Sequence, residues 1–393
     1  MDNIHKFDFD TVVPRRGTNS YKWDVPTDKD VIPMWVADMD FKTAPCIIEA
    51  LYKRVQHGIF GYTFVPDEYY EATIDWFYNR HNLSLKREWI LYTSGVVPAI
   101  SAVIKALTSP GDQVIVQTPV YNCFFSSIRN NECEIIENKL IRKDGSYVMD
   151  FEDLELKAGN AKAKVLLPCN PHNPAGRVWS RDELKRLGEI CMRNNVVVVS
   201  DEIHCEIVFP PYKYVPYASI SDEFRAASVT CCSPSKAFNI AGLQIANIFC
   251  ENKDMRARID RALNINEVCD VNPFGVIALI EAYRNGGEWL EAVVDYIHGN
   301  YIYLKNAFNK LLPDFPVMRL EGTYLAWVDC SVLEKSSSRI VAEIMDREKV
   351  LLNSGEMYGA TDGSYIRINL GAPRQLVEEG VNRIVTALKE LKG

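Results

Sequence analysis

Between residues 89 and 250, short apolar runs rich in β-branched residues alternate with longer segments whose apolar positions recur at helical spacing. This alternation is typical of a parallel sheet covered by helices. The runs are almost continuously apolar, which suits strands buried on both faces. The expected strands are residues 90–93, 113–117, 164–167, 196–200, 228–232 and 244–249.

Helices are expected between and after these strands. Residues 97–107 and 181–193 have helical periodicity, and the second segment begins with a capping box made by Ser180 and Glu183. Beyond residue 274 the pattern is mainly helical, over 276–283, 289–312 and 375–391, with a strand pair near 323–328 and 364–369. We therefore expect a large α/β domain over 47–286 and a smaller domain over 287–393, to which residues 1–46 contribute.

Composition narrows the classes of function. The 393 residues are 47% hydrophobic, enough for a large core, and carry a net charge of −8, which offers no broad basic surface for nucleic acid or anionic lipid. The eleven cysteines are scattered without a C-x-x-C pair, so neither a disulfide framework nor a metal site is indicated. No signal peptide or membrane-spanning run is recognisable, and we expect a cytoplasmic protein that acts on small molecules.

Four polar segments directly follow predicted strands. In an open α/β sheet, ligands bind outside the carboxyl ends of the strands, so these segments are expected to meet at one site. They are SGVVPAIS at 94–101, NPHNPAG at 170–176, SDEIH at 200–204 and SPSKAFNIAG at 233–242.

The order and placement of these segments resemble the fold-type-I pyridoxal-phosphate enzymes of the class I/II aminotransferase superfamily, over nearly the whole chain. The resemblance implies an α/β fold: a large domain with a mostly parallel seven-stranded sheet covered by helices, and a smaller α+β domain. It also implies pyridoxal 5′-phosphate as the cofactor.

Two residues would carry the cofactor chemistry. Lys236 matches the lysine that forms a Schiff base with the cofactor and then removes the substrate Cα proton, and lysine suits this role because desolvation readily lowers its pKa. Asp201 matches the carboxylate that keeps the pyridine nitrogen protonated, so that the ring accepts electrons. An isolated loop lysine is usually solvated, and an isolated strand-end aspartate is often only a cap. The surrounding motifs favour the functional interpretation.

Three further residues are assigned by the resemblance. Asn173 corresponds to the side chain that hydrogen-bonds the cofactor's 3′-oxygen, although asparagine in a proline-flanked turn is more often structural. Tyr121 corresponds to the aromatic residue that stacks on the pyridine ring, and we expect it to contribute to catalysis and substrate binding. His204 stands where many aminotransferases have a tyrosine near the phenolic oxygen.

The phosphate site would be built around a helix start. Gly95, Val96 and Val97 join a strand to a helix whose free backbone N–H groups favour an anion, and Ser233 could add a hydroxyl donor. A plainly capped helix start is the alternative. Tyr62 matches the tyrosine that reaches the phosphate from the neighbouring subunit, which implies a homodimer.

Arg367, in YIRINLGAPR, matches the arginine that binds the substrate α-carboxylate with its planar fork. A structural salt bridge is the alternative for an arginine inside an apolar strand. No second arginine can be assigned to a side-chain carboxylate, so a dicarboxylic substrate is not indicated. The chain also has Gln244 where many aminotransferases have a phosphate-binding arginine, and an amide cannot form the charge-assisted pair.

Several stretches resemble the MalY/PatB type of cystathionine β-lyase, a carbon–sulfur lyase. They are IPMWVADMDF at 32–41, GIFGYT at 58–63, SPSKAFNIAGLQ at 233–244, GTYLAWVD at 322–329 and RINLGAPR at 367–374. Within the first stretch, Asp38 is expected to bind substrate. The resemblance implies α,β-elimination from an amino acid such as cystathionine, to give a thiol, pyruvate and ammonia.

Two other functions remain open at this level. Transamination to a 2-oxo acid uses the same lysine, aspartate and arginine, so these residues alone do not separate it from elimination. A regulator or binding protein built on this fold is the alternative from another class. The intact set of Asn173, Asp201, Lys236 and Arg367 favours an enzyme.

Overall fold

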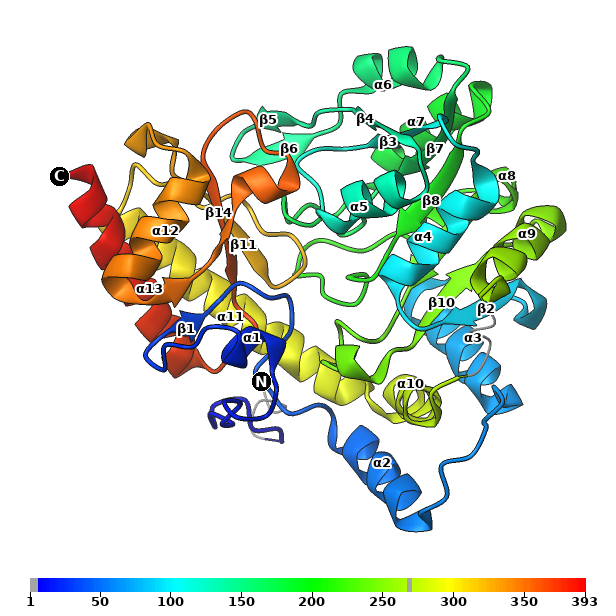
Figure 1. Ribbon diagram of the computed structural model, residues 1–393, viewed down its shortest axis with the longest axis horizontal. Coiled ribbons are helices and arrows are strands. Elements are labelled where there is room, and N and C mark those ends of the chain that lie inside the picture. The colour runs from blue at the N-terminus through cyan, green and yellow to red at the C-terminus, as the bar shows by residue number, and fades with distance from the viewer. Residues whose placement is uncertain (1–5, 267–270) are drawn as a thin grey trace.

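A seven-stranded sheet forms the centre of the larger part of the molecule (Figure 1). The computed structural model describes residues 6–266 and 271–393. All strands run parallel except β10, which pairs antiparallel with both of its neighbours. In spatial order they are β2 (Ile90–Thr93), β10 (Ala246–Phe249), β9 (Ser228–Cys232), β8 (Val197–Asp201), β7 (Ala163–Leu167), β3 (Gln113–Val116) and β4 (Glu134–Glu137).

The predicted strands of this sheet are present to within one residue at each end, with two larger differences. The last one begins at Ala246, because Gln244 has a left-handed backbone (φ 54°) that ends a short 3-10 turn. The edge strand β4 was not predicted, since its Glu-Ile-Ile-Glu sequence is polar at both ends and only partly buried.

Both faces of the central strands are buried, which explains their continuous apolar sequences. In β3, Val114 and Val116 pack into one core cluster while Ile115 packs into another on the opposite face. The first cluster lies beneath α4 (Val96–Leu107), α5 (Cys123–Asn130) and α9 (Lys253–Asn264). The second includes residues of α6 (Phe151–Ala158) and α7 (Arg181–Arg193). The predicted capping box starts α7: Ser180 accepts from the Glu183 N–H, and Glu183 accepts in return.

A second, smaller sheet lies beside the large one (Figure 1). The predicted strand pair is β11 (Leu325–Asp329) and β14 (Tyr365–Asn369), antiparallel, with Arg367 opposite Trp327, and β13 (Asn353–Ser354) adds a third strand. Helix α12 (Ser337–Glu348) packs against β13 and β14 of this sheet, and α13 (Arg374–Lys392) contacts both α12 and the long α11 (Gly287–Leu311).

The amino-terminal segment reaches the smaller part of the molecule. Its strand β1 (Ile32–Pro33) pairs in parallel with β12 (Val350–Leu351), far along the chain. Residues 1–5 of the predicted 1–46 contribution lie outside the described part, and the domain limits at 46 and 286 stay predictions. The remaining elements are α1 (Tyr21–Asp24), α2 (Pro45–His57), α3 (Asp67–His81), β5 (Ile141–Lys143), β6 (Ser146–Val148), α8 (Asp222–Ala226) and α10 (Pro273–Asn285). None of the helices in the described ranges is both long and apolar enough to cross a membrane.

Candidate active site

A cavity lies at the carboxyl ends of the parallel strands, where the four polar segments were expected to meet. The segments do converge there, and the backbone of the amino-terminal segment adds Ala37. The lining residues are Ala37, Ser94, Gly95, Val96, Val97, Pro98, Tyr121, Cys169, Asn173, Asp201, Ile203, His204, Ser235, Lys236, Ala241 and Ile245.

Lys236 enters this cavity from the turn after β9. Its Nζ donates a hydrogen bond to the carbonyl oxygen of Ala37, 2.6 Å away. The pKa of the amine is lowered to about 8, mainly because the group is buried; Asp38 opposes this decrease and Arg367 contributes to it. The amine is therefore poised to exist partly as a free base near neutral pH, which condensation with an aldehyde and proton abstraction both require.

Asp201 ends β8 and is almost completely buried. Its Oδ1 accepts the Ile203 N–H at 3.1 Å, and no cationic side chain of the described residues forms an ion pair with it. Burial raises the pKa of this carboxyl to about 7. A buried carboxylate of this kind is costly unless a cationic donor reaches it, which fits a ligand carrying a protonated ring nitrogen.

His204, three residues further along, is also buried in the cavity wall. Burial lowers the pKa of its imidazole to about 3, so the ring is neutral at physiological pH. Its Nδ1 has no hydrogen-bond partner in the described structure. A neutral imidazole nitrogen facing a ligand can donate or accept one hydrogen bond, depending on its tautomer.

The amino terminus of α4 forms another wall of the cavity. Gly95 is the N-cap, and no side chain caps the helix. The first-turn N–H groups of Val96 and Val97 therefore have no capping partner, while Pro98 at the third position has no N–H to satisfy. This arrangement suits a phosphate, since the N–H groups and the helix dipole both favour an anion.

Arg367 is 3% exposed and is held by neutral groups. Its Nη2 donates to the Trp35 carbonyl (2.7 Å) and its Nη1 to Asn173 Oδ1 (3.1 Å), while the guanidinium carbon lies 4.8 Å from the centre of the Tyr358 ring. Among the described residues no carboxylate pairs with it, and its Nε has no acceptor. The predicted alternative of a structural salt bridge therefore does not describe this side chain, which can still bind an anion.

Tyr121 also lines the cavity, where burial raises the pKa of its hydroxyl. Two aromatic residues near it were not singled out from the sequence. Tyr324 is fully buried and donates to the Ala37 carbonyl at 2.9 Å, and Tyr358 lies under Arg367. Tyr324 lies in the stretch GTYLAWVD, which identified the subfamily but gave no role to this side chain.

Four predicted site residues are absent from the cavity wall, namely Arg367, Ser233, Asp38 and Tyr62, and Gln244 also lies outside it. Ser233 uses its hydroxyl internally, donating to the Ile245 carbonyl at 2.6 Å and accepting the Ser235 N–H, so Ser235 and not Ser233 faces the cavity. Gln244 also points elsewhere, because its left-handed backbone turns it into a different depression. Asp38 pairs with Arg15 at 2.7 Å instead of facing the cavity. Tyr62 is 96% exposed and does not reach the cavity of its own chain.

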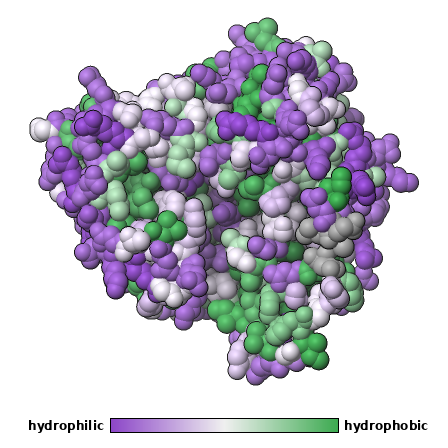
Figure 2. Space-filling view, in the orientation of Figure 1, coloured by the Kyte–Doolittle hydropathy of each residue, from purple (hydrophilic) through white to green (hydrophobic). Residues whose placement is uncertain are grey.

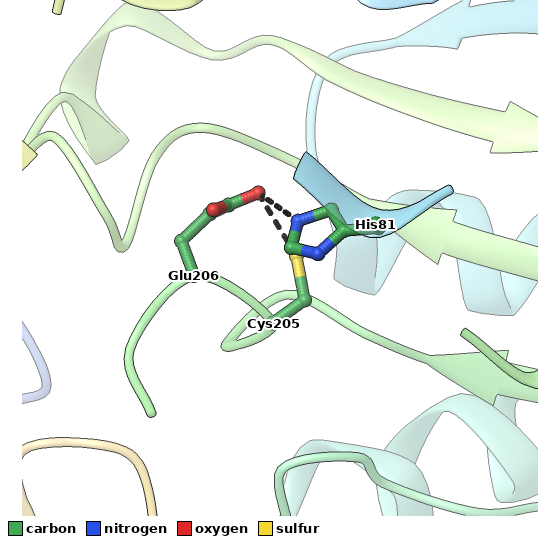
Figure 3. Close-up of side chains that lie close together, drawn as sticks. All are labelled: His81, Cys205 and Glu206. Carbon is green, nitrogen blue, oxygen red and sulfur yellow. Dashed lines mark hydrogen bonds and ion pairs between the residues drawn. The ribbon is translucent and has the colours of Figure 1, made fainter. Parts of the chain in front are cut away.

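A second polar cluster lies away from the cavity, between α3 and the segment after β8. Figure 3 shows the Glu206 carboxylate pointing at the imidazole ring of His81 and the sulfur of Cys205. Oε1 of Glu206 accepts from His81 Nε2 and Trp76 Nε1, both at 2.7 Å, and Arg80 pairs with Oε2 at 3.2 Å. The carboxylate is thus fully engaged by donors, and the cluster fixes α3 to the segment that carries His204.

The fold and site together place the chain in a known class. It belongs to the aminotransferase class I and II family, which it matches over residues 29–384. It is 41% identical to cystathionine β-lyase PatB of Bacillus subtilis, over 97% of this chain and 99% of that protein. It is 32% identical to Protein MalY of Escherichia coli, over 98% of this chain and 100% of that protein. The crystal structure of Treponema denticola cystalysin, which contains pyridoxal 5′-phosphate, superposes with a TM-score of 0.95 at 35% identity, over 98% of this chain and 100% of that one.

Proposed function

We propose that this protein is a pyridoxal-phosphate-dependent carbon–sulfur β-lyase acting on cystathionine or a related cysteine S-conjugate. The observation that carries the proposal is one cavity lined by a buried lysine and by a buried carboxylate without a cation, whose wall residue Asn173 accepts a hydrogen bond from a buried guanidinium without a carboxylate. The 41% identity to a cystathionine β-lyase supports the choice of reaction.

The cavity fits the proposed cofactor. The α4 amino terminus and Ser235 suit the phosphate, Asp201 suits the ring nitrogen, and Asn173 and His204 suit the phenolic oxygen. Lys236 is the amine that holds the aldehyde carbon. Bound pyridoxal phosphate supplies an electron sink for the pair of electrons left at Cα when a proton is removed.

The chain's own residues would then orient the substrate and move its proton. Arg367 would bind the α-carboxylate through guanidinium N–H groups, since none of the described carboxylates pairs with it, and this would fix how Cα faces Lys236. The Lys236 amine takes the Cα proton, and its lowered pKa keeps a useful fraction in the base form. A thiol leaving group has a pKa of roughly 8.5, so it departs from Cβ without strong assistance. The net reaction consumes water and yields thiol, pyruvate and ammonia.

Transamination is the second candidate, because the family as a whole is named for it and it uses the same proton abstraction. The two are separated by incubating the purified protein with cystathionine and no 2-oxo acid. Pyruvate should form, and Lys236→Ala should abolish its formation. Pyruvate that appears only when a 2-oxo acid is added and consumed would refute the lyase proposal. Borohydride treatment of the loaded protein should fix a pyridoxyl group on Lys236.

We also propose a homodimer in which Tyr62 of one subunit completes the phosphate site of the other. Figure 2 shows apolar side chains gathered at the end of the molecule where α2 lies. Exposed residues of this kind lie on α2 and in the segment after it: Ile48, Tyr52, Val55, Ile59, Phe60, Tyr62 and Phe64. Exposed apolar side chains gathered in this way suit burial against a second copy.

A cytoplasmic location completes the proposal. The cysteines of the described ranges are all free thiols, and most are buried. Unpaired thiols in this number suit a reducing compartment.

A further inference from the structure

The segment Trp35–Asp40 presents a backbone oxygen to the lysine of the site. The Ala37 carbonyl accepts hydrogen bonds from Lys236 Nζ at 2.6 Å and from Tyr324 Oη at 2.9 Å. A carbonyl oxygen accepts hydrogen bonds but does not take up a proton, so it orients the amine without removing its proton. Ala37 therefore marks the position of the lysine nitrogen when that nitrogen is not joined to a ligand.

Two asparagines fix the backbone of this segment. The amide of Asn369 donates to the carbonyls of Val36 (2.5 Å) and Asp38 (2.7 Å). Asn239, three residues after the lysine, accepts the Met39 N–H at 3.0 Å and donates to the Met39 carbonyl at 2.9 Å. Both the small sheet and the lysine turn thus hold the same short stretch of chain.

The two aspartates of the segment share two cations but are satisfied unequally. Asp40 is bound by Arg15, Lys22 and Trp23 at 2.7, 2.7 and 2.8 Å. Asp38 pairs with Arg15 through Oδ2 at 2.7 Å, whereas its Oδ1 is buried, has no hydrogen bond and lies 3.6 Å from Lys22. A buried carboxylate oxygen without a donor is costly, so the negative charge of Asp38 is only partly compensated by its own network.

We propose that Asp38 is a positioning residue for Lys236: next to the Ala37 carbonyl that holds the amine, its carboxylate stabilises the positive charge that the amine carries after it takes a proton. Arg15 and Lys22 hold Asp38 in place and set how much of its charge reaches the lysine. What the amine does in the reaction rests on the proposed lyase function. This role replaces the substrate-binding role expected from the sequence.

Among the groups around Lys236, Asp38 is the one that fits this stabilising role. Arg367 from β14 opposes a positive charge on the lysine, while Asp201 from β8 and the Cys123 thiol at the start of α5 favour it. Asp201 is assigned to the cofactor ring, and Cys123 has no carboxylate to offer. The neighbouring His204 and Tyr324 are neutral, because burial lowers the pKa of His204 and raises that of Tyr324. Asp38 is then the carboxylate available on the lysine side of the site.

Competitive labelling of amines tests the proposal on the full chain freed of cofactor. The rate of Lys236 acetylation by acetic anhydride is followed against pH by mass spectrometry of its peptide. Asp38→Asn keeps a group that can bind Arg15 but removes the charge, and should move the titration midpoint of Lys236 to lower pH by about 1 unit. Arg15→Gln should move it to higher pH, because the Asp38 charge is then less compensated. Asp40→Asn removes a charge from the same network but is further along the chain from the Ala37 carbonyl, so it should move the midpoint less than Asp38→Asn does while lowering stability.

Opposite shifts for Asp38→Asn and Arg15→Gln support the proposal, since general loosening of the segment would move both midpoints the same way. An unchanged midpoint in either folded variant, or equal shifts for Asp38→Asn and Asp40→Asn, overturns it. If Asp38→Asn does not fold, the sign of the Arg15→Gln shift decides. The labelling does not depend on turnover, so the titration midpoint of Lys236 can be interpreted even if the lyase proposal fails. In active loaded enzyme, the acid limb of kcat should shift in the same direction as the midpoint.

Discussion

Arg367 donates a hydrogen bond to the side-chain oxygen of Asn173, 3.1 Å away, although the two residues are 194 positions apart in the chain. The first belongs to the small sheet and the second to the turn after β7 of the large one. A neutral amide therefore orients a buried guanidinium at the junction of the two sheets. The substrate and cofactor roles proposed for these two residues therefore share one contact.

Arg367→Lys should weaken substrate binding more than it weakens the fold. A lysine can keep the charge but not the planar fork that grips a carboxylate, and we expect kcat/KM for cystathionine to fall by about 100-fold, mostly through KM. Steady-state kinetics with the loaded enzyme measure this. Arg319→Lys is the control, since that side chain donates only to a surface carbonyl. Equal KM values for the Arg367 variant and wild type would contradict the assignment.

Asp201→Asn should make the cofactor-free protein more stable at about pH 8. The folded pKa of Asp201, about 7, exceeds its ordinary value of 3.8, so the native state binds this proton more tightly than the unfolded chain does. The stability contributed by the protonated carboxyl is complete below 3.8 and is lost as the pH rises through 7. The asparagine stays neutral, and its advantage should be about 1–4 kcal/mol above pH 7 and vanish near pH 4.

Urea unfolding of both cofactor-free proteins at the two pH values checks this sign, with the exposed Asp222→Asn as control. A variant no more stable than wild type at about pH 8 would mean that Asp201 has a compensating partner in the cofactor-free protein. In the loaded enzyme the same substitution should be unfavourable. Loss of the charge opposite the ring nitrogen is expected to lower kcat on the order of 10²–10³-fold, as for other preorganised groups.

Ser233→Ala and Ser235→Ala should separate stability from cofactor binding. Ser233 is buried and satisfies both the Ile245 carbonyl and the Ser235 N–H, so its loss should cost about 1–3 kcal/mol of stability. Ser235 lines the cavity, and its loss should weaken cofactor affinity with little effect on unfolding. Urea unfolding of the cofactor-free proteins and cofactor titration measure the two effects. The reverse pattern would restore Ser233 as the phosphate donor.

Tyr62→Ala should leave the unfolding free energy of the isolated subunit within about 0.5 kcal/mol of wild type, because the side chain is 96% exposed. If the tyrosine reaches a partner's phosphate site, cofactor affinity should nevertheless fall by about 10-fold, the equivalent of one hydrogen bond. Tyr78→Ala, exposed on α3, is the matched control. Unchanged affinity in a variant that still forms dimers would argue against a shared site.

The sequence was sufficient to predict most strands of the large sheet and the segments that line the cavity. Continuous apolar runs predicted the central strands, since burial on both faces leaves no room for polar alternation, as Val114, Ile115 and Val116 show. Because parallel strands end at one edge, the segments containing Gly95, Asn173, Asp201 and Lys236 were expected to meet, and all four residues line one cavity.

Which polar atoms face the cavity depends on contacts between segments that are far apart in the chain. Ser233 and Gln244 lie in the right segment, but a hydrogen bond to Ile245 and a left-handed φ turn them away. Asp38 forms an ion pair with Arg15. Ala37 contacts Lys236 through its backbone carbonyl, and a pattern of side chains in the sequence does not reveal such a contact. Local sequence sets where a strand ends, whereas the direction of a side chain depends on the competing partners that distant segments bring to it.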